Sequence, residues 1–272
     1  MERVLSRINL RRVSWNIPLL ALVGLVFLGW WLNTPPGLSG KADAVGYAVC
    51  HRIDSRSFHL GDRQIAMCAR CTGMYLGAML GLVYQVIGGR RRAGSPPKKV
   101  IALLGALTLA FAIDGLNSYL HFFPNAPHLY EPQNWSRLLT GTGMGLVIAA
   151  ALFPAFNQSV WNTRDNRPAL GSITALGRLI VLAMLLDLLV LTENSVILYP
   201  LSLVSAAGVI IILMIVYSLI SLVVFRAEHS YTRLKQMWLP LTAGFGMAIL
   251  QIAVLDLVRF LITGTWEGFH LG

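Results

Sequence analysis

Seven long apolar stretches decide what this chain can fold into. They cover about residues 15–32, 71–88, 99–122, 137–156, 171–191, 196–225 and 238–263. A helix needs about 20 apolar residues to cross a hydrocarbon core of about 30 Å, so each stretch is long enough to span a membrane. Backbone groups in lipid must be paired within their own segment, which favours helices. The sequence therefore predicts an all-α, polytopic transmembrane bundle with about seven spans.

The charged residues agree with this interpretation. Only 12% of the residues are charged and 56% are hydrophobic, whereas about a quarter of a soluble domain is charged. The net charge of +10 would suggest nucleic acid as a partner of a soluble protein. Here the basic residues fall in short runs between apolar stretches, as topology signals do. We expect the lipid bilayer as the partner and no binding of nucleic acid.

The placement of lysine and arginine predicts the orientation, because cytoplasmic loops are rich in both. Four basic groups fall on one side if the spans alternate, and that side is then the cytoplasm. The groups are Arg3, Arg7, Arg11 and Arg12; Arg90, Arg91, Arg92, Lys98 and Lys99; Arg164 and Arg167; and Arg226, Arg233 and Lys235. We expect a multi-pass protein of the bacterial cytoplasmic membrane, with its N-terminus inside, its C-terminus outside and its first span retained rather than cleaved as a signal peptide.

Two polar groups stand out between the spans. The first runs from Cys50 to Phe58 and continues from Cys68 to Gly73, where the second span begins. The second consists of Asp114, Asn117, Asn134, Arg137 and Thr140, at the ends of the third and fourth spans. Under the predicted topology both groups lie at one depth on the outer face. We therefore expect them to form one site.

Their order and spacing resemble a known family. The strings C-H-R…R-S-F…C-A-R-C-T-G-x-Y-x-G, I-D-G-L and N-x-x-R-x-x-T-G are similar to those of DUF2085, a family of uncharacterised prokaryotic membrane proteins. The resemblance covers about residues 46–150, and the matching residues are Cys50, His51, Arg56, Ser57, Phe58, Cys68, Arg70, Cys71, Thr72, Gly73, Asp114, Gly115, Asn134, Arg137, Thr140 and Gly141. It implies a membrane class without an activity. We divide the chain into a first helix with the start of the outer loop (1–45), a DUF2085-like core (46–157) and a three-helix extension (158–272).

The cysteines point first to a metal. Cys50, Cys68 and Cys71, with His51 or alternatively His59 as a fourth ligand, give the donor set that zinc prefers, and C-x-x-C is its usual half-site. Zinc is therefore the expected cofactor. The metal would activate water if one position stays open, with Asp114, Asn134 and Arg137 as catalytic partners. The alternative is a structural zinc staple in a non-catalytic membrane subunit or scaffold.

Arginine-rich loops next to such a centre favour an anionic ligand. The expected anion-binding residues are Arg52, Arg56, Ser57, Arg70 and Thr72, because guanidinium groups pair bidentately with phosphate and carboxylate. An anionic lipid or a lipid-linked phosphate fits a site at the membrane surface. The second alternative is a membrane thiol–disulfide oxidoreductase that uses Cys68 and Cys71, which lie at a helix N-terminus where thiol pKa values fall.

Overall fold

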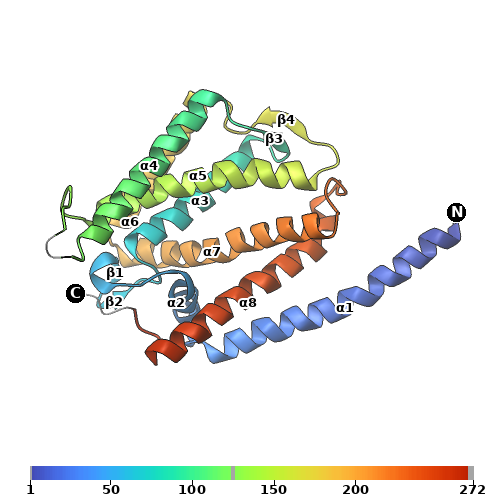
Figure 1. The fold of residues 1–272 in the computed structure, drawn as a ribbon, viewed down its shortest axis with the longest axis horizontal. Coiled ribbons are helices and arrows are strands. Elements are labelled where there is room, and N and C mark those ends of the chain that lie inside the picture. The colour runs from blue at the N-terminus through green and yellow to red at the C-terminus, as the bar shows by residue number, and fades with distance from the viewer. Residues whose placement is uncertain (1, 124–125, 269–272) are drawn as a thin grey trace.

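The computed structural model describes residues 2–123 and 126–268 as a bundle of long helices (Figure 1). The helices are α1 (Glu2–Asn33), α2 (Gly37–Val49), α3 (Ala69–Gly88), α4 (Lys98–Leu120), α5 (Asn134–Val160), α6 (Ile173–Leu191), α7 (Ser195–Val224) and α8 (Trp238–Thr263). The connections contain the short strands β1 (His59–Leu60), β2 (Arg63–Gln64), β3 (Arg92–Gly94) and β4 (Asp165–Pro168), and the 3-10 turns η1 (Asp54–Arg56) and η2 (Leu234–Met237). Within the described residues, seven helices are long and apolar enough to cross a membrane, which confirms the predicted all-α architecture.

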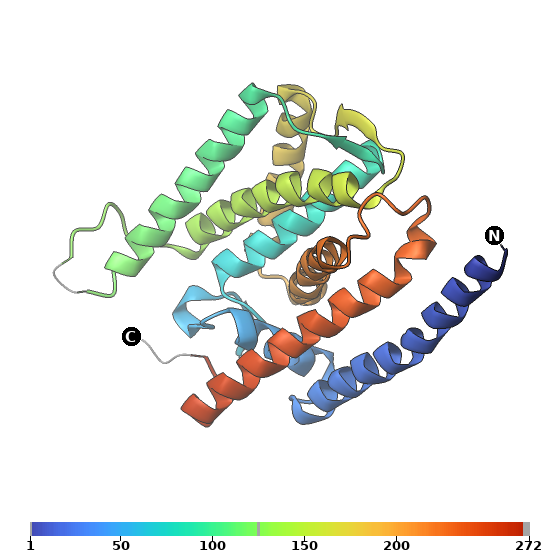
Figure 2. The same ribbon diagram turned by 45° about the vertical axis from the view of Figure 1, so that its right-hand side comes forward.

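Helices α3 and α5 make the most extensive contact in the bundle (Figure 2). Glycines bring their backbones together, as small residues do between membrane helices. A Cβ atom on Gly145 of α5 would lie 2.6 Å from the backbone nitrogen of Ala78 in α3. A Cβ atom on Gly73 of α3 would lie 2.8 Å from Oγ1 of Thr142 in α5. The close packing of α3 against α5 therefore holds the N-terminal residues of the two helices near each other.

We expect Gly145→Leu to separate these helices. The new side chain has no space at the contact, so the free energy of unfolding should fall by about 2 kcal/mol or more, at the upper end of overpacking effects. Thermal unfolding in detergent measures the loss. Gly105→Leu is the matched control, because nothing lies within 4 Å of a Cβ atom built at Gly105 of α4. Equal stability of the two variants would contradict the role given to Gly145.

The two ends of the bundle carry different connections. At one end, β1 and β2 form an antiparallel hairpin in which His59 is opposite Gln64, and the backbone N–H of His59 donates to Glu193 in the α6–α7 turn. At the other end, β3 pairs in parallel with β4. The basic loops that follow α3, α5 and α7 meet at this second end, where Arg91 donates to Thr163 and Thr232. Both polar groups singled out in the sequence belong to the first end.

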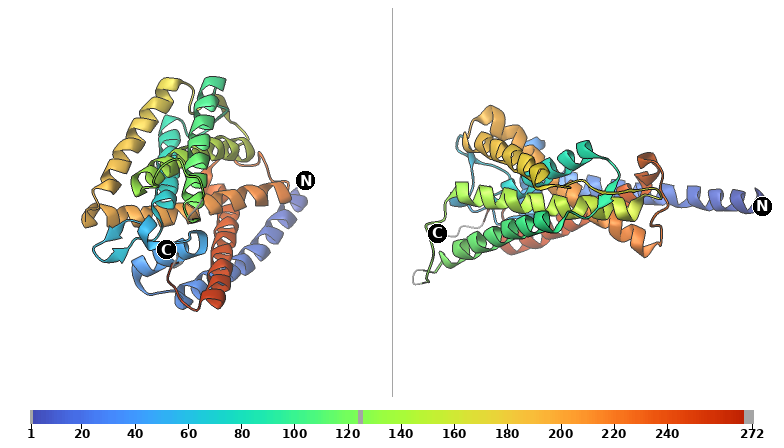
Figure 3. Two further views of the ribbon diagram at one scale, coloured as in Figure 1. Left: turned by 60° about the vertical axis from the view of Figure 1, so that its left-hand side comes forward. Right: turned by 90° about the horizontal axis from the view of Figure 1, so that it is seen from above.

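Helix α2 was not predicted from the sequence. It follows α1 after a short turn and packs against α7 and α8, while α1 contacts the bundle mainly through α8 (Figure 3). The Lys41 ammonium of α2 is buried and donates to Oγ1 and the carbonyl oxygen of Thr34, at 2.9 and 3.0 Å, and to the carbonyl of Trp31. A cation at a helix C-terminus satisfies free carbonyl groups and complements the helix dipole. This contact fixes α2 to the end of α1.

Candidate functional site

Three cysteine side chains meet where the first loop reaches α3. Cys50 ends α2, Cys68 is the N-cap of α3, and Cys71 lies in the first turn of α3. All three are free thiols, and their sulfur atoms lie within 4.8 Å of one another. Zinc–sulfur bonds of about 2.3 Å place the sulfurs of a tetrahedral site about 3.8 Å apart. The thiols are thus close to the spacing that one shared ion requires.

Hydrogen bonds favour negative charge on Cys50. Its Sγ accepts the backbone N–H of Cys68 at 3.3 Å and that of Arg52 at 3.5 Å. Hydrogen bonds from the thiols of Cys68 and then Cys71 hold the pKa of Cys50 well below its usual value. The pKa of Cys68 is raised to about 12, mainly because its thiol hydrogen is donated to Cys50. The Cys50 thiol therefore loses its proton more readily than the Cys68 thiol.

The last span holds the turn that carries Cys50. The Arg259 guanidinium of α8 donates to the carbonyl oxygens of Tyr47 at 2.5 Å, Cys50 at 2.6 Å and His51 at 3.2 Å. Within the same turn Arg52 adopts φ +50°, a left-handed conformation that costs about 1–2 kcal/mol for a residue with a Cβ atom. In this conformation Arg52 donates its backbone N–H to the Cys50 sulfur.

His51 is not in the sulfur group. Its Nδ1 accepts the backbone N–H of Ile53 at 3.2 Å, so one ring nitrogen is engaged within the loop. Burial is the main cause that lowers the pKa of His51, although the charge of Cys50 opposes this shift. The imidazole is therefore neutral at pH 7, the form in which histidine binds metals. The structure brings three ligand atoms together, and His51 as a fourth ligand stays a prediction.

Asp114 is the centre of a second cluster, formed by α3, α4, α5 and the α4–α5 loop. The carboxylate is 1% exposed and forms an ion pair with Arg70. Its Oδ1 accepts from the hydroxyls of Tyr130 at 2.7 Å and Ser136 at 3.3 Å. Its Oδ2 accepts from Nε of Arg70 and from Oγ1 of Thr140, both at 3.2 Å. Asp114 thus serves as a fixed counter-charge for Arg70, and its role as a general base stays a prediction.

Asn134 and Arg137 join α5 to the cysteine loop. Nδ2 of Asn134 donates to the carbonyl oxygens of Ser57 at 3.2 Å and Ser55 at 3.4 Å, while its Oδ1 accepts from Nη1 of Arg137 at 2.9 Å. Arg137 is 5% exposed, and its Nε has no hydrogen-bond partner among the described residues. The two polar groups of the sequence therefore do converge on one end of the bundle.

Arg56 adds a second buried cation to this place. Its guanidinium lies 3.7 Å from the centre of the Phe122 ring, and the residue is 9% exposed. Burial, followed by the positive charges of Arg137 and Arg70, lowers the pKa of Arg56 to about 10, so it remains protonated at neutral pH. Among the residues that the structure describes, neither Arg56 nor Arg137 has a carboxylate partner. The cluster therefore has an excess of positive charge.

The other predicted anion-binding residues are engaged in local contacts. Arg52 pairs with Asp43 at 3.2 Å, and Arg70 pairs with Asp114. The Ser57 hydroxyl donates to the Ile53 carbonyl at 2.9 Å and accepts from Gln64 at 2.6 Å, and the Thr72 hydroxyl donates to the Met67 carbonyl at 3.2 Å. This leaves Arg56 and Arg137 as the two guanidinium groups with capacity for a ligand.

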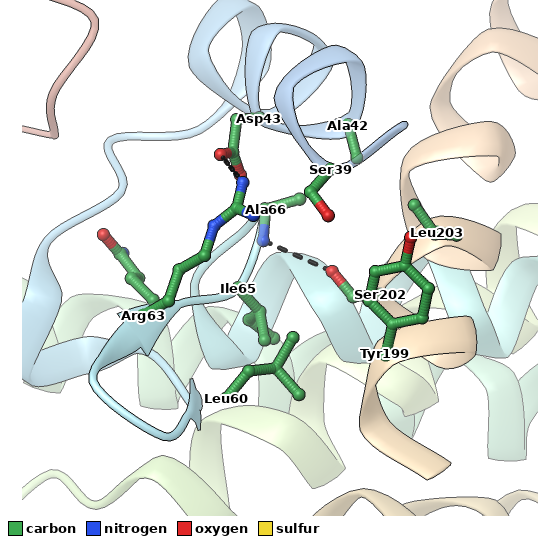
Figure 4. A pocket seen from close by; sticks show the side chains of 11 residues that line it. Ser39, Ala42, Asp43, Leu60, Arg63, Ile65, Ala66, Tyr199, Ser202 and Leu203 are labelled. Carbon is green, nitrogen blue, oxygen red and sulfur yellow. Dashed lines mark hydrogen bonds and ion pairs between the residues drawn. The ribbon is translucent and has the colours of Figure 1, made fainter. Parts of the chain in front are cut away.

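The hairpin between Cys50 and Cys68 is held from two sides (Figure 4). Arg63 pairs with Asp43 of α2 at 2.5 Å, and the backbone N–H of Ala66 donates to the Ser202 hydroxyl of α7 at 3.3 Å. The cavity between these residues has a volume of about 10 Å³, which is room for about one water molecule. The two contacts fix the loop, and the small cavity between them leaves no space for a substrate.

Sequence reasoning missed several residues of this site. Tyr130 and Ser136 donate their hydroxyl hydrogens to Asp114, the carboxylate that also pairs with Arg70. Such hydroxyl groups in loops and first helical turns have no distinctive sequence pattern. Phe122 covers Arg56 and reads in the sequence as an ordinary interfacial aromatic residue. Arg259 did carry a signal, because an ionisable side chain inside a span is a functional candidate by default. Its contact with the distant Cys50 turn could not be foreseen.

The residues of both clusters fall within one stretch of similarity. Residues 50–151 match the family model described as "Predicted membrane protein (DUF2085)". This stretch is therefore similar to the DUF2085 family. It contains all three cysteines together with Asp114, Asn134 and Arg137, whereas α1, α2 and α6 to α8 lie outside it. The prokaryotic membrane family expected from the motifs is thereby confirmed.

Two archaeal proteins are similar to part of this chain. An uncharacterised protein from Methanocaldococcus jannaschii is 25% identical over 118 residues, which are 43% of this chain and 70% of the relative. An uncharacterised protein from Methanothermobacter thermautotrophicus is 29% identical over 101 residues, which are 37% of this chain and 81% of the relative. No solved structure matches the chain.

Proposed function

We propose that this chain is a zinc-binding membrane protein whose metal centre holds the anionic head group of a lipid or lipid-linked substrate. The observation that carries the proposal is the meeting of the Cys50, Cys68 and Cys71 sulfurs within 4.8 Å, on segments fixed by α2, α3 and α8. Three thiolates leave one position of a tetrahedral zinc for His51, water or a ligand. Catalytic zinc sites keep such a position open, so transfer or hydrolysis of a lipid-linked phosphate is the sharpest form of the proposal.

The charge distribution supports an anionic ligand. Arg56 and Arg137 lie close enough for their charges to act on each other, and the charge of Cys68 acts on Arg56 as well. Two buried cations without carboxylate partners are costly unless an anion compensates them. A phosphate group would accept from both guanidinium groups with charge-assisted hydrogen bonds. We place this site on the outer face of a bacterial cytoplasmic membrane, because the basic loops gather at the opposite end of the bundle.

Elemental analysis of detergent-purified protein, with thiol counting on the same sample, tests the proposal. We expect about one zinc per chain and three reduced thiols, the count for one tri-thiolate centre. Zinc should be released as the pH falls, because protons compete for the sulfur ligands. Absence of any transition metal from protein purified without chelator, together with a disulfide, would overturn the zinc centre.

The second candidate function is thiol–disulfide exchange, and the lowered pKa of Cys50 favours it. The attacking thiolate would then be Cys50 rather than the Cys68 or Cys71 expected from sequence. Its attack on an external disulfide would form a mixed disulfide and release the partner thiolate, and Cys68 or Cys71 would then displace the bound half. Trapping that mixed disulfide with a Cys68→Ala, Cys71→Ala variant distinguishes it from a metal centre.

A further inference from the structure

A second group of metal-binding side chains lies on the loop that joins α4 to α5 (Figure 1). It consists of His121, His128 and Glu131, and one ligand atom of each lies within 4.8 Å of the other two. Nε2 of His121 lies 3.7 Å from Oε2 of Glu131, and Nε2 of His128 lies 3.3 Å from Oε1. Zinc bonds of about 2.0–2.1 Å to nitrogen and oxygen place the donor atoms of a tetrahedral site about 3.3 Å apart. The three side chains are therefore close to the spacing that one ion requires.

Hydrogen bonds to α4 hold this loop in place. Oδ1 of Asn117 accepts the backbone N–H of Leu129 at 2.6 Å, and its Nδ2 donates to the carbonyl oxygen of Tyr130 at 2.8 Å. These two loop residues lie directly between His128 and Glu131 in the chain. The third ligand is the residue that caps the C-terminus of α4. All three ligands are thus positioned by the same helix before an ion binds.

The protonation of His128 calls for a cation between these groups. Its Nδ1 lies 3.4 Å from the carbonyl oxygen of Ala126. Because a carbonyl oxygen only accepts, Nδ1 carries the hydrogen, and the neutral ring presents a lone pair at Nε2. This lone pair faces a carboxylate oxygen of Glu131, which also only accepts when it is ionised. A proton joins two such acceptors, whereas a metal ion joins all three groups that meet here, with His121 as the third.

We propose that His121, His128 and Glu131 bind a divalent transition-metal ion at a site separate from the thiol centre. Imidazole ligands suit zinc, copper, iron and nickel, whereas magnesium and calcium take oxygen ligands. Two imidazoles and one carboxylate hold zinc in one class of catalytic sites and leave a position for water.

The exposure of the ligands distinguishes this site from the thiol centre. The side chains of His121, His128 and Glu131 are 40%, 38% and 70% exposed, whereas Cys50 and Cys68 are buried. We therefore expect the ion on the loop to exchange with the buffer and to leave during purification. The zinc content of the purified protein then reports on the thiol centre, and the loop site is measured by adding zinc back.

Modification of histidine by diethyl pyrocarbonate tests the site on the full chain in detergent. The reagent attacks the unprotonated nitrogen of a neutral imidazole, and a bound ion blocks that nitrogen. With zinc chloride at ten times the dissociation constant, about one site in eleven stays free. Modification of His121 and His128, located by mass spectrometry, should therefore slow about tenfold. His229 is exposed in the loop that follows α7 at the opposite end of the bundle, and it should react at an unchanged rate.

Glu131→Gln keeps both histidines and removes the carboxylate ligand. It should raise the zinc concentration for half protection more than tenfold, since loss of a ligand costs more than loss of an outer-shell partner. Glu193→Gln is the matched control, because Glu193 is an exposed glutamate at the same end of the bundle. Its amide oxygen can still accept the backbone N–H of His59, so full protection should remain.

Four results would overturn the inference. They are equal modification rates with and without zinc, protection of one histidine alone, full protection in Glu131→Gln, and equal protection by magnesium chloride. Elemental analysis of the purified protein tests the thiol centre separately. Protection without purified zinc removes the thiol centre alone, and purified zinc without protection removes the loop site alone.

Discussion

Replacing Cys68 with serine is expected to abolish stoichiometric zinc binding. The variant keeps the shape of the side chain but removes one of three sulfur ligands. Loss of an outer-shell partner of a metal ligand already costs about 10–100-fold in affinity, and loss of the ligand itself costs more. Because a structural zinc contributes its binding free energy to folding, the melting temperature should also fall. Elemental analysis and thermal unfolding on the same preparation measure both effects.

Met67→Leu is the matched control for this experiment. Met67 is fully buried beside Cys68 and carries a sulfur that is not among the three clustered ligand atoms. Exchange of methionine for leucine nearly conserves volume and costs less than about 1.5 kcal/mol. The control should retain its zinc. Equal zinc content in Cys68→Ser and the unmodified chain would remove Cys68 from the centre.

Asp114→Asn is expected to lower the free energy of unfolding by about 3–5 kcal/mol, the cost of removing one partner of a buried ion pair. The amide leaves the Arg70 guanidinium, which is 18% exposed, without a compensating charge. It also places an NH₂ group where Tyr130, Ser136 or Thr140 donates its hydroxyl hydrogen. Thermal or denaturant unfolding in detergent measures the loss. Removing both charges with Arg70→Met and Asp114→Leu should restore part of it.

Asp187→Asn provides the comparison for a buried carboxylate without an arginine. Asp187 is 2% exposed and accepts one hydrogen bond, from the Thr142 hydroxyl at 2.6 Å. An amide oxygen can accept the same bond and no cation loses its counter-charge, so the loss of stability should be smaller than in Asp114→Asn. A loss as large in Asp187→Asn as in Asp114→Asn would show that the ion pair with Arg70 is not the cause.

Most of the architecture could be predicted from the sequence, because the thickness of the hydrocarbon core sets the length of every spanning helix. Six of the seven stretches reappear as helices within about four residues of their predicted bounds, whereas α1 already begins at Glu2 rather than near residue 15. The convergence of the Cys50–Gly73 segment with Asp114 and Asn134 also followed from topology, since alternate spans return to the same face. The glycines at the contact of α3 and α5 recur every four residues in the sequence, a spacing typical of close helix contacts in membranes.

Other features needed the three-dimensional structure. Helix α2 is too short to span, and Lys41 and Asp43 interrupt its apolar pattern, so it read as loop. Which arginines already have a carboxylate partner depends on contacts between distant segments, as between Arg70 and Asp114. The packing of α2 against α8 joins two helices that are separated by residues 50–237 of the chain. No local pattern encodes such a meeting.

Arg259 connects the thiol cluster to the last span. Its three bonds to backbone carbonyls attach the turn of Cys50 to α8, whereas Cys68 and Cys71 belong to α3. Spanning helices adjust their tilt when bilayer thickness changes. A change in the tilt of α8 relative to α3 therefore moves one sulfur against the other two. We therefore expect the spacing of the three sulfurs, and with it the affinity for the proposed ion, to depend on the thickness of the membrane.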